Sequence, residues 1–174
     1  TVHRTELAIA NVDCGYYGTH HLTLARHPSE TKERLMVRLL VFALHADERM
    51  EFTRGLCVGD EPAMWVKSLS GEIEKWVEIG RPDERRIRKA CSRARQVLVY
   101  AYGGRAADLW WKRVRHHIRR YGNLRVFSLS RSATRSLASL AARSMRLQCT
   151  IQDGRIWLGT AKAIVPIEPR KLVG

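Results

Sequence analysis

The chain has 174 residues, of which 45% are hydrophobic, so it is long and apolar enough for one ordinary domain with a buried core and is not expected to be disordered. No apolar run approaches the roughly 18 residues that a membrane-spanning helix needs, and no signal-peptide pattern opens the sequence. The formal net charge of +14 favours phosphate-rich partners, although a solvated basic surface with only nonspecific affinity explains the same charge.

The spacing of cysteine and histidine argues against a metal site built from these residues. The four cysteines are widely spaced without a C-x-x-C pair, and the histidines show no metal-ligand spacing. The neighbouring pair His20 and His21, like His116 and His117, splays apart on a helix or a strand. We therefore expect free thiols, a reducing cytoplasm and no zinc.

The N-terminal part is predicted to form a hairpin followed by a helix. Residues 5–25 alternate around a turn that contains Gly15. Ser29 is suited to cap a helix over residues 29–46, whose broad apolar surface predicts deep burial. The charges Glu33 and Arg38 on this helix are explained either by surface pairing or, for a functional site, by a carboxylate that reaches into a cleft.

A strand, a turn and a short helix are expected next, over residues 50–57, 58–62 and 63–67. Asp60 is suited to cap that short helix, because aspartate is favoured before a helix and in turns. The alternative is that its carboxylate points toward the acidic residues of the following strand.

Residues 69–103 are predicted to form a strand, a helix and a second strand, around which the chain is organised. The strand over residues 73–79 alternates, the helix begins near Pro82, and the second strand covers residues 97–102. A strand, crossover helix and strand most simply make a right-handed unit with parallel strands.

Three carboxylates lie on one face of the first of these strands. Alternation places Glu72, Glu74 and Glu78 on the same side as Trp76. Because like charges repel at this spacing, solvent, a basic neighbour or a metal ion must offset them.

The remaining elements are two helices and several strands. The helices are predicted over residues 105–121 and 132–143, and the strands over residues 124–129, 147–152, 156–158 and 163–167. We expect all of these elements to join one α/β domain over residues 1–174.

The first of these helices has a basic face. Its tryptophans lie on the packing face, whereas the opposite face carries cations with almost no acids, which favours contact with phosphates. The candidate nucleic-acid-binding residues are Lys112, Arg113, Arg115, Arg119 and Arg120.

The phosphate-binding loop, the dinucleotide-binding loop and the nucleophile elbow of hydrolases are all missing from the sequence. Acidic residues on a central strand, a basic surface and a nearby helix with Lys89 remain. Clustered carboxylates that hold Mg²⁺ and orient a water beside a phosphate make a hydrolytic site.

Several segments resemble one family closely. They are LARHPSET at 24–31, DER at 47–49, FTRGL at 52–56, DEP at 60–62, WVEIGRPDERRIRKAC at 76–91 and CTIQDG at 149–154. They resemble the YaeQ family of bacterial proteins, and the resemblance covers nearly the whole chain. That family is similar in fold to the PD-(D/E)XK nucleases. The resemblance therefore implies a single mixed β-sheet flanked by helices, a variant of the restriction-endonuclease-like core with added β-hairpins.

The resemblance also implies roles for individual residues. Glu78 matches the glutamate of the E-x-K motif, and Asp60 is the candidate for the preceding acid, with Glu61 and Glu74 as rivals. Glu33 matches the place where such nucleases often add a carboxylate. Asp60, Glu78 and Glu74 would hold Mg²⁺ or Mn²⁺.

The lysine of that motif is missing, because Gly80 stands in its place. Some relatives supply the lysine from the following helix, where Lys89 is the candidate here. The helical wheel places Lys89 roughly opposite the apolar stripe of Ile87 and Ala90, so it must reach around the helix.

Three hypotheses follow from the sequence. The leading one is a nuclease-like protein that engages nucleic acid and hydrolyses phosphodiesters with Mg²⁺. The second is a non-catalytic nucleic-acid-binding module with the same fold, which the missing lysine favours. The third is an interaction protein whose basic face meets an acidic protein partner.

Overall fold

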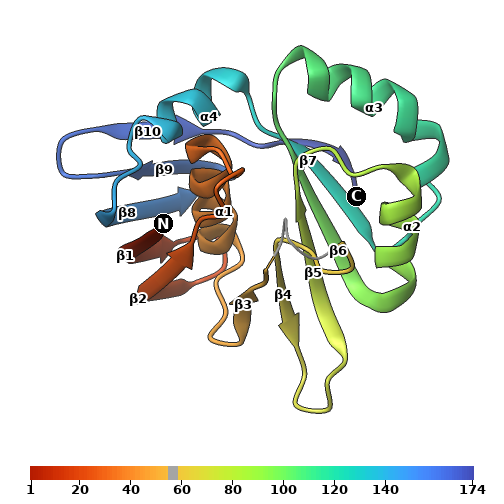
Figure 1. Ribbon diagram of the computed structural model, residues 1–174, viewed down its shortest axis with the longest axis horizontal. Helices are drawn as coiled ribbons and strands as arrows, with labels where there is room; N and C mark the ends of the chain where they lie inside the picture. Colours follow the sequence, from red (N-terminus) through yellow and green to blue (C-terminus); the bar gives the residue numbers. More distant parts are fainter. Residues whose placement is uncertain (55–58) are drawn as a thin grey trace. The chain divides into compact units, whose positions relative to one another are not determined.

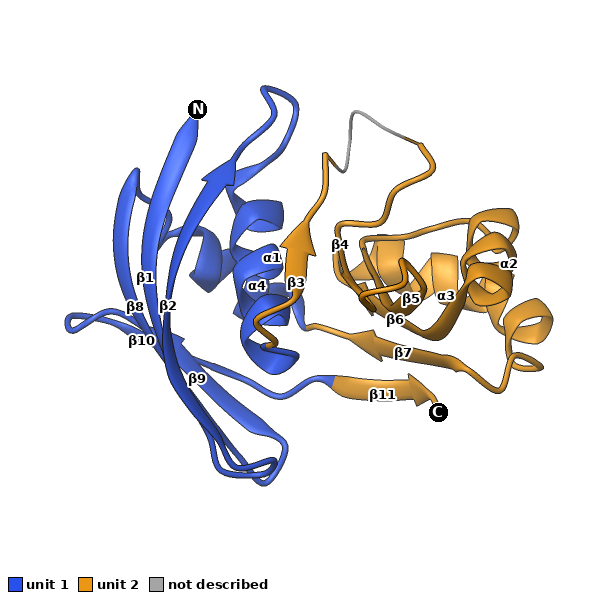
Figure 2. Ribbon diagram, turned by 90° about the horizontal axis from the view of Figure 1, so that it is seen from below, with its two compact units in different colours: residues 1–46, 130–169 blue, residues 47–129, 170–174 orange. Residues whose placement is uncertain are grey.

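The computed structural model describes residues 1–54 and 59–174, and it contains two mixed β-sheets with helices packed on them (Figure 1). The chain divides into two compact units, which Figure 2 shows in different colours. Unit 1 comprises Thr1–Ala46 and Ser130–Pro169, and unit 2 comprises Asp47–Leu129 and Arg170–Gly174. The α/β class is confirmed, whereas the prediction of one sheet is wrong, since each unit has its own.

Unit 1 is a five-stranded sheet of order β10-β9-β8-β1-β2 with two helices. Its pairings are antiparallel except for β1 and β8, which run parallel. The elements are β1 (Val2–Asn11), β2 (Tyr16–Ala25), α1 (Lys32–Leu44), α4 (Arg131–Ala138), β8 (Ser144–Gln152), β9 (Arg155–Gly159) and β10 (Ile164–Ile167).

The core of unit 1 lies between one face of this sheet and its two helices, which Figure 2 shows on the same side of the sheet. Alternate residues of β1 and β8, including Leu7 and Leu147, are fully buried. The predicted N-terminal hairpin is confirmed with the register Leu7 opposite His20, and a turn at Asp153 and Gly154 joins β8 to β9.

Helix α1 begins later than predicted. Thr31 is its N-cap and accepts a hydrogen bond from the backbone N–H of Arg34 at 3.0 Å, whereas Ser29 bonds to the ring of His27. Ser29 therefore precedes the helix, and the threonine two residues later performs the capping.

One charge of α1, Arg38, is buried and pairs with a buried acid just before the helix. Glu30, just before the helix, accepts from Arg38 at 2.6 Å and also pairs with Arg34, while Arg38 donates to the carbonyl of Ala25 at 3.1 Å. Glu30 and Arg38 are each 4% exposed. This ion pair joins the start of α1 to the end of β2.

Unit 2 is a six-stranded sheet of order β11-β7-β6-β5-β4-β3 with two helices. The elements are β3 (Met50–Phe52), β4 (Met64–Lys67), β5 (Ile73–Ile79), α2 (Glu84–Arg93), β6 (Ala94–Ala101), α3 (Arg105–Ile118), β7 (Leu124–Ser128) and β11 (Arg170–Val173). Strands β5, β6 and β7 are parallel, and the outer strands pair antiparallel.

The predicted strand, helix and strand are confirmed as β5, α2 and β6, with β5 parallel to β6. Helices α2 and α3 share one hydrophobic core with this sheet. Ile87 and Ala90 of α2, Trp110 of α3 and Trp76 of β5 belong to it. Asp83, rather than Pro82, precedes α2 as its N-cap and accepts from the N–H of Arg86 at 2.8 Å.

Several further elements differ from their predictions, among them α3, which ends at Ile118 rather than at residue 121. Residues 64–67 form strand β4 rather than a short helix, because Met64 and Val66 bury one face while β4 pairs with β5. Helix α4 ends at Ala138, and strand β11 was not predicted. The strand predicted over 50–57 is observed as Met50–Phe52, and its last residues, with Cys57, lie outside the described residues.

Three cysteines of the described ranges are free thiols, as expected: Cys14, Cys91 and Cys149. Burial raises the pKa of Cys91 to about 11 and that of Cys149 to about 12. None of the helices in the described ranges is both long and apolar enough to cross a membrane.

The buried ion pair of unit 1 predicts a large effect of removing its carboxylate. Glu30→Ala leaves the buried guanidinium of Arg38 without this anion, and we expect the free energy of unfolding to fall by about 3–5 kcal/mol. Glu168→Ala, at an exposed glutamate of the same unit, is the control and should change it by less than about 0.5 kcal/mol. Urea denaturation measures both, and equal stability of the two variants would contradict the prediction.

Candidate functional site

The three acids around β5 are each offset by a different arginine. Glu72, just before the strand, pairs with Arg95 at 3.2 Å. Both carboxylate oxygens of Glu74 accept from Arg49, at 3.1 and 3.0 Å, and Arg49 also holds Asp47. A basic neighbour, one of the three offsets that the sequence left open, is therefore present at each of these acids.

Glu78 is the buried member of this group, with 5% of the residue exposed. Its Oε1 accepts from the indole N–H of Trp76 at 2.8 Å and from Nε of Arg86 at 2.8 Å. The strand brings Trp76 beside Glu78 because residues two apart share a face. A charged carboxylate is tolerated here because it is both paired and hydrogen-bonded.

Arg86 also binds the loop that carries Asp60. Its Nη2 donates to the carbonyl of Glu61 at 2.6 Å, and its Nη1 donates to the carbonyl of Gly59. One guanidinium therefore joins β5, α2 and the segment 59–61. Arg86 was not among the predicted site residues. Its place on the first turn of α2, three residues after the N-cap, is the feature of the sequence that could have indicated a contact with the preceding strand.

Asp60 and Lys89 form an ion pair one helical turn further along α2. Lys89 Nζ lies 2.5 Å from Oδ1 of Asp60, and both side chains are more than half exposed. The hydrogen bond and charge of Lys89, with Arg93 and Arg86 nearby, lower the pKa of Asp60. Lys89 lies away from the packing face of α2, as the helical wheel predicted. The prediction that Asp60 caps a helix is wrong, because the element that follows it is strand β4.

The remaining candidate acids have partners of their own. Glu61 accepts from the backbone N–H and the guanidinium of Arg54, at 3.3 and 3.5 Å. Glu33 belongs to unit 1, where its Oε2 accepts from the hydroxyl of the fully buried Thr134 at 2.9 Å. This bond joins α1 to α4, which gives Glu33 a structural partner that the sequence did not indicate.

The carboxylates of unit 2 do not fit a divalent cation as they stand. A Mg²⁺ or Mn²⁺ site needs several oxygen ligands converging on one point. In the described ranges, no group of three or more His, Cys, Asp or Glu side chains has that arrangement. Arg86 also occupies Oε1 of Glu78, and Lys89 occupies Oδ1 of Asp60, where a cation would bind.

The predicted basic residues of α3 are largely exposed, although the helix ends at Ile118, so that Arg119 is its C-cap and Arg120 follows it. Lys112, Arg113, Arg119 and Arg120 are exposed, and Arg115 is half-buried, while Trp110 and Val114 face the core. Arg120 lies over the ring of Tyr121, with its guanidinium carbon 5.2 Å from the ring centroid. We call the four exposed residues, Lys112, Arg113, Arg119 and Arg120, the cationic face.

The cationic face is poorly neutralised. Counting only partners within residues 1–54 and 59–174, Lys112, Arg113 and Arg119 make no ion pair with a carboxylate. The neighbouring helix α2 adds the exposed cations Arg85 and Arg88. The cations of this part of unit 2 therefore remain available to an external anion.

The sequence matches the family described as YaeQ protein over residues 1–169. The chain belongs to the YaeQ family. It is 44% identical to the YaeQ protein of Escherichia coli K12 over 162 residues, which is 93% of this chain and 90% of that protein. It is 44% identical to the Salmonella typhi YaeQ protein over 168 residues, 97% of this chain and 93% of that one.

Two solved YaeQ structures have the same fold. The crystal structure of the Xanthomonas axonopodis pv. citri YaeQ protein matches with a TM-score of 0.97 and 48% identity, covering 100% of this chain and 98% of that one. The Pseudomonas syringae YaeQ structure matches with a TM-score of 0.96 and 32% identity, covering 100% and 96%. These names state no activity, so a function for this YaeQ chain has to be argued from its residues.

The contacts of Glu78 predict that it is needed for stability, whereas Asp60 is not. Glu78→Ala leaves a buried indole N–H and the guanidinium of Arg86 without their acceptor, which should lower the free energy of unfolding by about 2–4 kcal/mol. Asp60→Ala should leave it nearly unchanged, because that pair is exposed. Thermal denaturation of the two variants tests this, and equal melting temperatures would refute it.

Proposed function

We propose that this protein binds nucleic acid through the cationic face of unit 2, without a metal ion and without cleaving the chain it binds. The observation that carries this proposal is that Lys112 and Arg113 of α3 and its C-cap Arg119 are exposed and lack carboxylate partners in the described ranges. A row of fixed cations on a rigid helix matches the regular spacing of backbone phosphates.

The charge of the whole chain supports the same partner. A net charge of +14 attracts polyanions over a distance, and each phosphate neutralised by a lysine or an arginine releases condensed counterions. Such contacts position a nucleic acid but do not select a sequence. The proposed activity is therefore backbone recognition.

The centre around Glu78 has a structural role in this proposal. Arg86 holds Glu78 and the carbonyls of Gly59 and Glu61, so the pair fixes α2 against β5 and the segment 59–61. We also propose that the fold is a variant of the PD-(D/E)XK core. The support is that Glu78 lies on strand β5 and Lys89 lies on the following helix α2. This is the order of a motif whose acid is on a strand and whose lysine has moved to the next helix.

Neutralising the cationic face should abolish most of the binding. The variant with Lys112, Arg113, Arg119 and Arg120 all replaced by Gln should bind a labelled DNA duplex at least tenfold more weakly at physiological salt. The slope of log K against log salt concentration should decrease in magnitude by up to about 3.6, at about 0.9 per phosphate contact. Fluorescence anisotropy over a series of salt concentrations measures both.

A matched control removes the same charge from unit 1. Lys32, Arg131, Arg135 and Lys162 are exposed, and replacing all four by Gln changes the net charge equally. This control should keep most of the affinity and the salt slope. If the two variants lose the same affinity, binding follows net charge alone and the proposed face is wrong.

Metal-dependent hydrolysis of a phosphodiester is the second candidate function. The observation that favours it is that Lys89 of α2 reaches Asp60, while Arg86 ties Glu78 to the same loop, so the candidate acids and the displaced lysine adjoin one another. The cations that occupy these acids would have to release them before Mg²⁺ or Mn²⁺ could bind.

The second candidate is tested with a variant that does not disturb the core. Asp60→Asn removes one proposed metal ligand at an exposed position. We expect the wild-type chain and this variant to leave labelled DNA and RNA intact to the same extent in Mg²⁺ or Mn²⁺. Cleavage by the wild type that Asp60→Asn abolishes would establish the hydrolytic function in place of simple binding.

A further inference from the structure

The sheet of unit 1 has one face that the helices of that unit leave uncovered. Figure 2 shows α1 and α4 on the same side of the sheet, and no other element of unit 1 lies on the opposite side. On the uncovered face, alternate residues of each strand point outward. The strand register aligns them in rows across the sheet.

One of these rows has an exposed aromatic ring toward each end. Trp157 of β9 lies opposite Thr150 of β8, which pairs with Ala10 of β1, which pairs with Tyr17 of β2. Tyr17 is 65% exposed and Trp157 is 38% exposed. Three strand spacings, about 14 Å, separate the two rings.

A hollow of about 360 Å³ lies beside Tyr17 on this row. Small residues, among them Ala8, Ala10 and Thr150, line most of it, and Gln148 is its longest non-aromatic side chain. A flat ring can therefore approach the sheet beside Tyr17 over Ala8 and Ala10.

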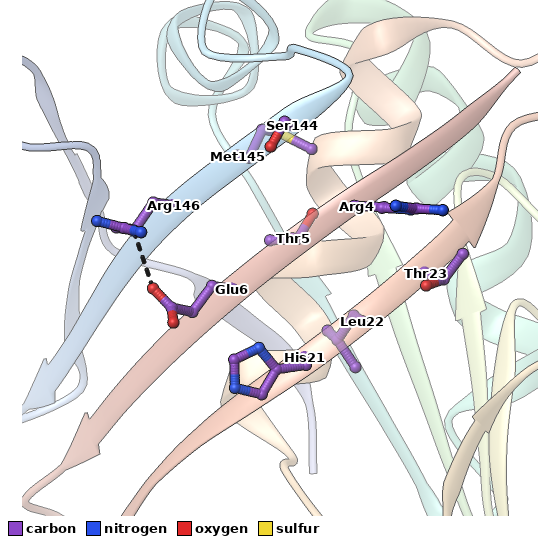
Figure 3. Close-up of a pocket in the computed structure, with 9 residues that line it drawn as sticks. All are labelled: Arg4, Thr5, Glu6, His21, Leu22, Thr23, Ser144, Met145 and Arg146. Atoms are coloured by element: carbon purple, nitrogen blue, oxygen red, sulfur yellow. Dashed lines mark ion pairs between the residues drawn. The ribbon is translucent and has the colours of Figure 1, made fainter.

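Polar and basic side chains occupy the same face about 13 Å further along the strands. They line a second hollow of about 590 Å³, which Figure 3 shows with the side chains standing out from three neighbouring strands. Its lining includes Arg4, Glu6, His21 and Arg146. Glu6 pairs with Arg146 at 3.0 Å, an exposed pair that a stronger anion can displace.

The charge of this face is positive. Arg4, Arg146 and Arg155 lie on it with Glu6 as the acid, and Arg4 makes no ion pair with any residue of the described ranges. Two other exposed apolar side chains, Val2 and Ile164, lie on the same face. Exposed aromatic rings beside arginines on an open sheet are the chemistry that binds unpaired bases and their phosphates.

We propose that the uncovered face of unit 1 binds single-stranded nucleic acid. Bases stack on Tyr17 and Trp157, and the phosphates of the same strand contact Arg4 and Arg146. This site goes beyond backbone recognition by α3, because it lies in the other unit and requires unpaired bases. A duplex cannot use it, since its bases are already stacked on one another.

The test uses the full chain and a labelled oligothymidylate, followed by fluorescence anisotropy at physiological salt. Tyr17→Ala and Trp157→Ala should each weaken single-strand binding about tenfold, while binding of a labelled duplex changes by less than about twofold. Tyr17→Phe, which keeps the ring, should retain the affinity. Leu69→Ala, at a fully exposed apolar residue of unit 2, is the matched control and should have no effect.

Two further readouts separate stacking from other causes. Oligothymidylate should quench tryptophan fluorescence in the wild type, and Trp157→Phe should lose that quenching while it keeps most of the affinity. An oligoglutamate of equal charge should compete poorly, because it offers no bases.

The proposal is overturned if the alanine variants bind oligothymidylate like the wild type, or if oligoglutamate competes equally well, which would indicate an acidic protein partner. It is also overturned if the chain binds the duplex but not the single strand, although backbone recognition by α3 would then stand. Failure to bind either nucleic acid would defeat both proposals.

Discussion

The buried carboxylate of Glu78 is the constraint on which the candidate site of unit 2 depends. A charge at this depth must be paired, and the pairing of Glu78 with Arg86 ties α2 to β5. Arg86 then uses its remaining donors on the carbonyls of Gly59 and Glu61. The position of Asp60 near Lys89 follows from this arrangement.

This constraint explains why acids that resemble a nuclease site need not form one. Two of the acids that would hold Mg²⁺, Glu78 and Asp60, are paired with cations of α2, and the third, Glu74, is paired with Arg49. Because the chain has more cations than acids, each acid around β5 has a basic partner within the protein. The residues of the cationic face are then available to an external polyanion. The proposed nucleic-acid binding and the neutralised acidic centre thus have one origin in the charge balance of the sequence.

Local patterns predicted the elements whose burial is regular along the chain. The alternation of residues 73–79 gave β5 with its observed bounds, and the apolar stripe of Ile87 and Ala90 placed Lys89 on the outside of α2. The segment 64–67 was predicted wrongly because four residues carry too little periodicity, and only pairing with β5 makes them a strand. The partners of Glu78 were not predictable, since Arg86 and the carbonyls it binds are brought together by the fold.

Two surfaces with different chemistry follow from this account. The cationic face is suited to the nucleic-acid backbone, and the open sheet with two aromatic rings is suited to unpaired bases.

The most direct test of the central claim, binding without a metal ion and without cleavage, is the affinity of the full chain for a labelled DNA duplex in EDTA and in Mg²⁺ at matched ionic strength. The account predicts equal affinity and an intact duplex in both. Binding that requires Mg²⁺ and is followed by cleavage would contradict it.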